Sequence, residues 1–541
     1  MKRRSFLQSS ALGAAAISAL PLASCVTDNN KAGSVKLFDG ESDDFELNEI
    51  SVDELQQKIN DGVYTSEKIV QLYLKRIEDI DINGPGLNSV LELNPDALDI
   101  ARQLDKERAE GKLRGPLHGI PVMIKDNIDT GDKMMTTAGA LALAGHIAKK
   151  DSPLAAQLRK AGAIILAKTN LSEWANFRST RSSSGWSGRG GQVRNPYYLN
   201  HSPCGSSSGS GAAVSANLCM LAIGTETNGS VTCPSNANGV VGIKPTVGLI
   251  SRSGIIPISH TQDTAGPMCR TVKDAAHLLG ALTAEDVNDP ATLGERDKIF
   301  NDYTAFLDKD GLQGARIGVG RSYMGFHEAV DPVIEAALDI LREKGAELVD
   351  IEGSIGRSAS GAGMNVLLYE FKDGVNRYLQ GADDIDVNTL EDIIRFNREN
   401  EKESMPYFKQ EILEQAQEKG GLDSEEYLEA LESILKGYRD EGIDKVMEEH
   451  NLDAIVAPTR GLSWTIDLVN GDHGRGSSST PAARAGYPNI TVPAGFAFGL
   501  PLGLSFFGKA YTEPALLKFA YAFEQASMAR KKPGFLPHRD Y

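Results

Sequence analysis

The segment at residues 203–234 decides the fold, and its sequence is PCGSSSGSGAAVSANLCMLAIGTETNGSVTCP. It opens with a glycine- and serine-rich run at 204–211, continues through small and apolar residues at 212–224, and closes with the turn TETNGS at 225–230. Such a run is usually a flexible linker. Here it leads directly into residues apolar enough to be buried, which predicts one element crossing the core between two serine-bearing turns. Because tight glycine turns direct backbone N–H groups toward a developing anion, we interpret the segment as an active-site floor.

The composition around this segment is that of a soluble globular protein with a large core. The chain has 541 residues, of which 41% are apolar and 24% charged. Its formal net charge is −17. Nucleic acids and anionic membrane surfaces are bound by clustered lysine and arginine, so this charge argues against both as partners.

Cysteine and histidine spacing argues against a metal centre. The five cysteines show neither a CxxC pair nor metal-ligand spacing, so the sequence indicates neither a zinc site nor a disulfide framework. The nine histidines contain no HExxH pair. We therefore expect no metal and no cofactor. Cys233, three residues after Ser230, is interpreted as a packed thiol rather than a second nucleophile.

The amino terminus has the layout of an export signal. KRRSFL at 2–7 carries twin arginines, an alanine-rich apolar segment follows at 11–22, and LASC at 22–25 resembles a lipoprotein box. We predict a twin-arginine signal at residues 1–24, lipidation of Cys25, a polar tether at 25–45, and the catalytic domain at 46–541. Cys25 is otherwise a chance cysteine near an ordinary cleavage site. We therefore expect the protein to be exported to the periplasm or cell envelope and to be held at a membrane only by acyl chains.

Hydrophobic periodicity places helices and strands along the rest of the chain. Residues 315–351 alternate strand, helix and strand, and residues 365–450 are charged and helical, as in a lid or side wall. The loop at 178–203 has a length typical of functional loops. Helices are predicted at 51–80, 95–110, 154–160, 332–344 and 514–528, and strands at 90–93, 120–125, 163–167, 315–319, 346–351, 453–458, 489–494 and 502–507.

Lys125 ends the apolar strand at 120–125 and is followed by Asp126 and Asn127. An ordinary surface lysine closing a strand would look the same. The catalytic interpretation requires Lys125 to be desolvated, because burial lowers the pKa of a lysine and lets it act as a base.

With Lys125, Ser206 and Ser230 in place, residues 50–535 resemble the amidase signature family. The resemblance is carried by KDN at 125–127, GSS at 205–207, GS at 229–230 and GIKPT at 242–246. TETNGSVTCP at 225–234 and IPIS at 256–259 are similar to its peptide-amidase branch. The resemblance implies one large α/β domain with a mixed β-sheet core covered by helices.

The resemblance also implies a role for each motif residue. Ser230 would be the nucleophile, Ser206 a bridging serine after a cis Gly205–Ser206 peptide bond, and neutral Lys125 the base. The oxyanion hole would be formed by the backbone N–H groups of four consecutive residues, Thr227, Asn228, Gly229 and Ser230.

The implied reaction is hydrolysis of a carboxamide to an acid and ammonia through an acyl-enzyme on Ser230. The peptide-amidase branch suggests C-terminal peptide amides as substrates. Two alternatives stay open: a broader amidase or esterase acting on small acyl compounds, and a catalytically inactive lipoprotein that binds peptides. Intact Lys125, Ser206 and Ser230 favour the enzyme over the binding protein.

Two positions depart from the commonest family pattern. Asn228 stands where many members have a second glycine, and Thr232 where many have an arginine that meets an acid near position 226. Glu226 is therefore expected to have a different partner. The sequence GSSSG at 205–209 also matches the GxSxG nucleophile elbow with Ser207 as nucleophile. That elbow needs an apolar strand before it, and the polar, proline-containing residues 195–203 exclude it. His473, Trp186 and Trp464 are each either pocket residues or ordinary loop and core residues.

Overall fold

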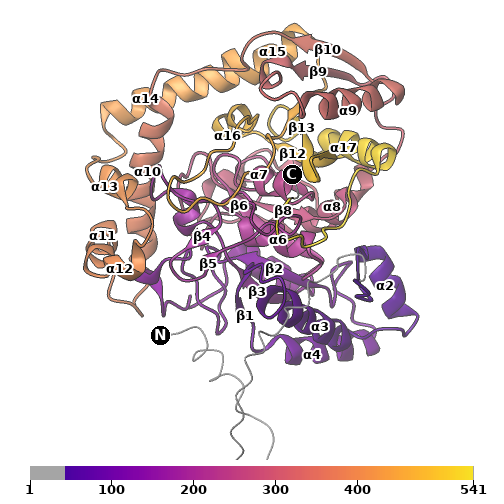
Figure 1. The fold of residues 1–541 in the computed structure, drawn as a ribbon, viewed down its shortest axis with the longest axis vertical. Coiled ribbons are helices and arrows are strands. Elements are labelled where there is room, and N and C mark those ends of the chain that lie inside the picture. The colour runs from indigo at the N-terminus through magenta and orange to yellow at the C-terminus, as the bar shows by residue number, and fades with distance from the viewer. Residues whose placement is uncertain (1–42, 540–541) are drawn as a thin grey trace, which may run out of the picture. The chain divides into compact units, whose positions relative to one another are not determined.

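An eleven-stranded mixed β-sheet organises residues 43–539, the part of the chain that the structure, a computed structural model, describes. The predicted signal, Cys25 and most of the tether lie outside the described residues. Figure 1 shows the sheet between helices that cover its two faces. In spatial order the strands are β1 (Val90–Leu93), β3 (Ile164–Thr169), β2 (Pro121–Lys125), β6 (Leu221–Glu226), β8 (Thr264–Cys269), β7 (Val241–Lys244), β12 (Asn489–Ala497), β13 (Leu500–Phe507), β11 (Ala454–Pro458), β9 (Arg316–Gly320) and β10 (Glu347–Ile351).

The sheet combines parallel and antiparallel pairs, as the α/β expectation with a mixed sheet requires. β2 runs parallel to β3 and β6, and β9 runs parallel to β10 and β11. The remaining neighbours pair antiparallel, including β7 with β12, where the strands of the two halves of the chain meet. A separate two-stranded sheet is formed by β4 (Trp186–Ser187) and β5 (Gly191–Gln192).

Helices occur where the apolar spacing predicts them, with bounds that differ by a few residues. The predicted helix at 51–80 is interrupted after residue 60 and then continues from α3 into a π-helical turn, Ile77–Ile82. The α-helices are α2 (Val52–Asn60), α3 (Ser66–Arg76), α4 (Ala97–Ala109), α5 (Pro153–Lys160), α6 (Ser208–Ser215), α7 (Thr232–Ala237), α8 (Val272–Leu282), α9 (Asp331–Glu343), α10 (Ala362–Leu379), α11 (Leu390–Glu399), α12 (Glu401–Ser404), α13 (Glu411–Gln417), α14 (Glu425–Leu435), α15 (Asp444–Glu449), α16 (Thr480–Ala485) and α17 (Glu513–Ser527). No helix among the described residues is both long and apolar enough to cross a membrane.

The prediction of one element across residues 212–224 was wrong. The segment divides into helix α6 and strand β6, joined by a short turn. Asn217 has a φ of 56°, the left-handed conformation that commonly ends a helix and that asparagine tolerates well. Helix α6 is buried along its whole length. A Cβ on Gly209 would lie 2.3 Å from the Ser89 carbonyl oxygen and 2.4 Å from that of Asn170, so only glycine fits there.

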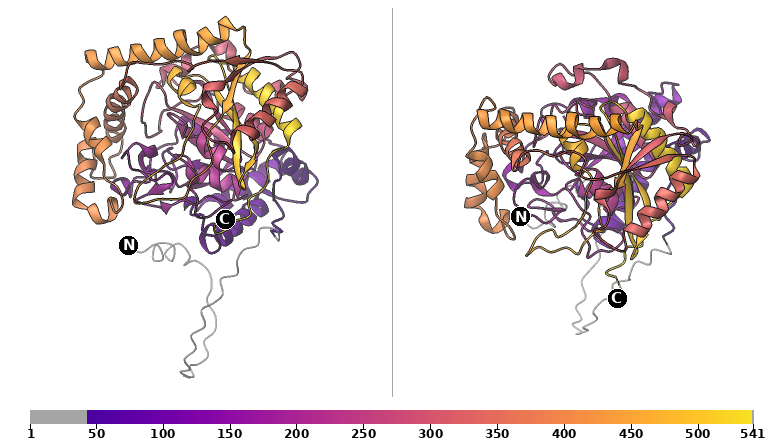
Figure 2. Two further views of the ribbon diagram at one scale, coloured as in Figure 1. Left: turned by 45° about the horizontal axis from the view of Figure 1, so that its top comes forward. Right: turned by 90° about the horizontal axis from the view of Figure 1, so that it is seen from above.

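The charged segment at 365–450 forms a helical wall, as expected. Figures 1 and 2 show α10 to α14 together along one edge of the described unit. Arg178, from the loop before the active-site floor, joins this wall to the rest of the molecule. Its fully buried guanidinium pairs with Glu173 and donates to the carbonyl oxygens of Ser404 (2.6 Å) and Phe408 (3.2 Å). Buried charges are stable only with such complete pairing.

Candidate active site

Lys125 lies at the carboxyl end of β2, in the interior of the protein. Parallel pairing with β3 and β6 brings the carboxyl ends of three buried strands to one edge of the sheet. The side chain is 0% exposed. Its Nζ lies 2.7 Å from Ser206 Oγ, 2.8 Å from Thr225 Oγ1 and 3.2 Å from the Thr225 carbonyl oxygen. The structure therefore joins two of the predicted site residues, Lys125 and Ser206, by a direct hydrogen bond.

The surroundings of Lys125 favour its neutral form. Burial lowers the pKa of Lys125 to about 7, against the opposing effect of the Asp263 and Glu226 carboxylates. Desolvation penalises the charged amine, and no salt bridge to Lys125 within 4 Å occurs among residues 43–539. The interpretation of Lys125 as a surface lysine is excluded by this burial. A lysine with a pKa near neutrality is chemically suited to act as a base.

The two serine turns lie against each other. The Gly205–Ser206 peptide bond is cis, as the resemblance predicts. The Ser207 N–H donates to the Ser230 carbonyl oxygen at 3.1 Å, which holds the start of one turn to the end of the other. Ser206 is fully buried, whereas Ser230 is 9% exposed. Within the described chain no hydrogen bond joins the Ser206 and Ser230 hydroxyls, although such catalytic contacts often tighten only when substrate binds.

A disulfide bond joins the same two turns, and it corrects the sequence prediction. Cys204 and Cys233 are bonded, with Cα atoms 6.0 Å apart, so Cys233 is not a packed thiol. Their separation of 29 residues follows no recognisable cysteine framework. The pairing arises because the fold brings the residue before Gly205 next to helix α7, which follows Ser230. Cys219 and Cys269 are free and buried.

The turn at residues 227–230 presents backbone N–H groups without acceptors among the described residues. In the chain as described, the N–H groups of residues 227–230 donate to no protein group, whereas those of Val231 and Thr232 do. Gly229 has a φ of 85°, which an L-residue with a side chain rarely adopts. Asn228 is held from the side, because its Oδ1 accepts a hydrogen bond from Ser479 Oγ at 2.7 Å. A cluster of free N–H groups beside a serine hydroxyl fits an oxyanion hole.

Glu226 pairs with backbone N–H groups, whereas the family pattern pairs an acid near this position with an arginine. A different partner for Glu226 was expected. Its Oε2 accepts hydrogen bonds from the N–H groups of Val231 (2.8 Å) and Thr232 (2.9 Å) and lies 3.2 Å from Thr232 Oγ1. Residues at the start of α7 thus replace the missing arginine. A carboxylate at a helix amino terminus is favourable because it caps unpaired N–H groups.

Thr225, Asn127 and Asp263 are site residues that the sequence analysis did not assign. Thr225 supplies two of the three oxygens around Lys125, and its Oγ1 also accepts from Asn127 Nδ2 at 3.0 Å. Asp263 accepts a hydrogen bond from Thr227 Oγ1 at 2.5 Å and so anchors the turn at residues 227–230. The signal available for Thr225 was its position at the end of β6, the strand beside Lys125.

Other residues singled out in the sequence prove to be structural. Ser207 is fully buried, and its hydroxyl donates to the Thr225 carbonyl oxygen at 3.1 Å, which confirms that it is not an elbow nucleophile. Trp186 and Trp464 are buried, and His473 lies on an exposed loop. Asp126 accepts from the Gly139 N–H at 3.1 Å and is also buried.

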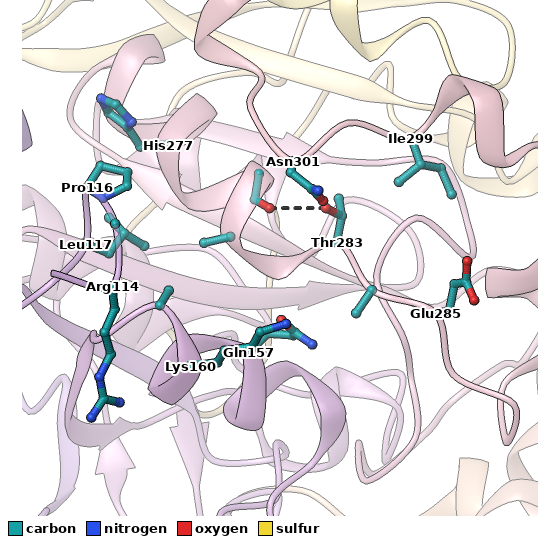
Figure 3. Close-up of a pocket in the computed structure, with 15 residues that line it drawn as sticks. Arg114, Pro116, Leu117, Gln157, Lys160, His277, Thr283, Glu285, Ile299 and Asn301 are labelled. Atoms are coloured by element: carbon teal, nitrogen blue, oxygen red, sulfur yellow. Dashed lines mark hydrogen bonds between the residues drawn. The ribbon is translucent and has the colours of Figure 1, made fainter. Parts of the chain in front are cut away.

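Two cavities bear on where a substrate could lie. A cavity of about 520 Å³ begins at Thr225 and Thr227 and extends to α10, where Tyr378 lines it. Figure 3 shows a larger cavity of about 840 Å³ between α5 and α8, with Arg114, Lys160 and His277 around it. None of the predicted site residues lines the larger cavity, so it lies apart from the Lys125–Ser206 centre.

Comparisons with known proteins agree with the geometry of this centre. The family model described as Amidase matches residues 68–517. A protein of Arabidopsis thaliana described as a probable amidase is 40% identical over 506 residues, covering 92% of this chain and 93% of its own.

Two solved structures are similar over almost the whole chain. A peptide amidase in complex with the competitive inhibitor chymostatin is 49% identical, with a TM-score of 0.87, covering 90% of this chain and 99% of its own. The native peptide amidase of Stenotrophomonas maltophilia is 48% identical, with a TM-score of 0.86, covering 91% and 99%.

Proposed function

Because the chain belongs to the Amidase family and is an amide-hydrolysing enzyme, we propose that it removes ammonia from the C-terminal amides of peptides. The reaction would run through an acyl-enzyme on Ser230, with Ser206 and Lys125 carrying its proton. The single observation that carries the proposal is the hydrogen bond of 2.7 Å between Ser206 Oγ and the fully buried Lys125 Nζ. A buried amine with a pKa near 7 in contact with a serine hydroxyl has a use in proton transfer that a structural lysine lacks.

The contacts of Lys125 also suggest the direction of proton flow. A neutral amine has two N–H donors and one lone pair. Lys125 Nζ has two oxygen neighbours on Thr225, the carbonyl oxygen and Oγ1. The carbonyl oxygen can only accept, so the two N–H groups of Lys125 are best directed at these two oxygens. The lone pair then faces Ser206 Oγ and can take its proton.

In the proposed reaction, Ser206 passes its proton to Lys125 and accepts one from Ser230 as Ser230 Oγ attacks the amide carbon. The oxyanion would be held by N–H groups of residues 227–230, each such donor being worth about 2.7–4 kcal/mol of barrier. Ser206 then donates one proton to the leaving nitrogen while Lys125 returns its proton to Ser206, and ammonia departs. Water hydrolyses the ester of Ser230 after giving its proton to Ser206 by the same relay, and that proton finally returns to Ser230.

Ammonia release from an amidated dipeptide tests the proposal. We expect the parent protein, purified from residue 26 onward, to release ammonia, and its Ser230→Ala variant to be inactive while keeping the same circular dichroism. Ser215→Ala serves as the matched control, because it removes a buried serine hydroxyl at the carboxyl end of α6 that has no hydrogen-bond partner among the described residues. An inactive parent that cleaves small amides or esters would replace the peptide substrate with a broader one. A folded parent that cleaves no acyl compound but binds peptides would make the binding protein the better description.

We also propose that the enzyme is exported and anchored through a lipid on Cys25. The twin arginines and the LASC sequence support this, and so does the Cys204–Cys233 bond, because disulfides persist in oxidising compartments. Cell fractionation tests it: the parent should partition with membranes and Cys25→Ser should be released into the soluble fraction. Parent protein found only in the cytoplasm would contradict the export.

A further inference from the structure

Arg460 is a half-buried cation with no hydrogen-bond or ion-pair partner for its guanidinium among residues 43–539. Its Nε is buried and makes no hydrogen bond. The residues described contain no ion pair or hydrogen bond to the rest of its guanidinium either. Burial lowers the pKa of Arg460 against the opposing effect of the Asp472 carboxylate, which itself accepts hydrogen bonds from the Ser184 and Trp464 N–H groups. A buried Nε–H donor without an acceptor is costly, so an oxygen acceptor placed beside this guanidinium would be favourable.

The side chain is held in a fixed orientation. The guanidinium carbon lies 5.1 Å from the centre of the Trp464 ring, a stacking distance. The loop over this stack fits only because it has glycine at position 474: a Cβ there would lie 2.4 Å from the Trp464 ring and 3.1 Å from Arg460 Nη2. A stacked, planar guanidinium loses little freedom when it binds, so it is suited to hold an acceptor in one place.

The stack is connected to both active-site turns. Trp464 packs in one apolar cluster with Cys204 and Cys233, the disulfide that joins the turns of Ser206 and Ser230. Arg460 also pairs through its backbone with Ser477. Ser477 Oγ lies 3.0 Å from Ser479 Oγ, whose hydroxyl in turn donates to Asn228 Oδ1 in the oxyanion turn.

We propose that Arg460 is a substrate-positioning residue, which donates hydrogen bonds to the backbone carbonyl oxygen one residue before the amide that is cleaved. The proposal rests on the peptide-amide function given above. A peptide amide carries such a carbonyl on its acyl side, whereas a simple carboxamide has none. Arg460 would thus explain a preference for peptidyl amides over simple amides without contacting the reacting atoms.

Two substrates with the same isobutyl group separate this role from a structural one. N-acetyl-leucinamide has the upstream carbonyl, and 4-methylpentanamide lacks it. For Arg460→Met we expect kcat/KM on N-acetyl-leucinamide to fall about 10- to 100-fold, mostly through KM, with little change on 4-methylpentanamide. Arg460→Lys keeps the charge but loses the planar fork, so it should recover only part of the loss.

The matched control is Arg475→Met, which removes an exposed positive charge from the loop beside Arg460 and should change neither substrate. Equal losses on both substrates in Arg460→Met, or no loss on either, would overturn the proposal. A loss confined to an acidic substrate, N-acetyl-glutamic acid α-amide, would make Arg460 an anion site and overturn the carbonyl assignment.

If the parent protein is inactive on N-acetyl-leucinamide, the result counts against the proposed function and not against the role of Arg460 alone. If the Arg460→Met variant fails to fold, Arg460→Lys gives the same comparison of the two substrates.

Discussion

At the scale of single residues, the proposed mechanism requires one lysine to stay uncharged inside the protein. Lys125 is surrounded by neutral oxygens of Ser206 and Thr225, while the carboxylates that could hold its proton lie beyond hydrogen-bond distance. Full burial and the absence of a close counter-ion within the described chain together lower the basicity of the amine. The same features would destabilise the fold if Lys125 had to be protonated.

The pH dependence of the reaction follows from this lysine. Lys125 accepts a proton only in its neutral form, and the fraction of neutral amine rises as pH passes through its pKa of about 7. We expect kcat/KM to increase about tenfold per pH unit below pH 7 and to level off above it, measured by ammonia release between pH 5 and 9. Lys125→Ala should lose about 10²–10⁴ in kcat, the usual contribution of a positioned base. A rate independent of pH across this range would argue against Lys125 as the base.

At the scale of elements, the short helix α7 is held to the strand that precedes Ser230, the proposed nucleophile. Its first turn is capped by Glu226, the last residue of β6, so strand and helix are joined by hydrogen bonds that span Ser230. The cap replaces the arginine expected from the family pattern and uses backbone groups instead.

Loss of this cap should weaken the fold and the activity together. Glu226→Ala leaves two buried N–H groups, those of Val231 and Thr232, without an acceptor, which costs about 1–3 kcal/mol of unfolding free energy. Glu226→Gln keeps an oxygen acceptor and should lose less. Chemical denaturation measures both variants, and equal stability of the alanine variant and the parent would contradict the capping role.

The sequence predicted these elements unevenly, for physical reasons. Strand β2 was predictable because a short apolar run rarely forms anything other than a buried strand. The position of Lys125 at the end of this run then places the lysine at the end of the strand. The break between α6 and β6 was missed, since small residues suit both structures and only the conformation of Asn217 decides it. Ser206 and Ser230 came from motif resemblance, whereas Thr225 and Arg460 depend on contacts between strands and loops that spacing does not encode.

At the scale of the whole molecule, one disulfide bond joins the turns that carry Ser206 and Ser230, whereas the sequence analysis predicted no disulfide. Cys204 and Cys233 show no framework spacing, and only the packing of α6, β6 and α7 brings them together. The bond packs in one apolar cluster with Trp464 and Ala237.

Reduction of this bond should destabilise the protein. Closing a loop of this length stabilises a fold by about 3–4 kcal/mol. We expect the double variant Cys204→Ser and Cys233→Ser to unfold at a lower temperature by calorimetry, and dithiothreitol to lower the melting temperature of the parent but not of the variant. The control is Cys219→Ser, because Cys219 is a free buried thiol. Identical melting with and without reductant would show that the bond contributes nothing.

The junction of β7 with β12 has a consequence for synthesis on the ribosome. Ile243 of β7 pairs with Ile490 of β12. Because β12 lies near the end of the sequence, β7 has no partner on this edge until nearly the whole chain has been synthesised. Throughout that interval β7 presents an open edge, the surface through which nascent chains join to one another. Slow translation or truncation before β12 should therefore yield aggregates in which Lys125, Ser206 and Ser230 are all present but no enzyme has formed.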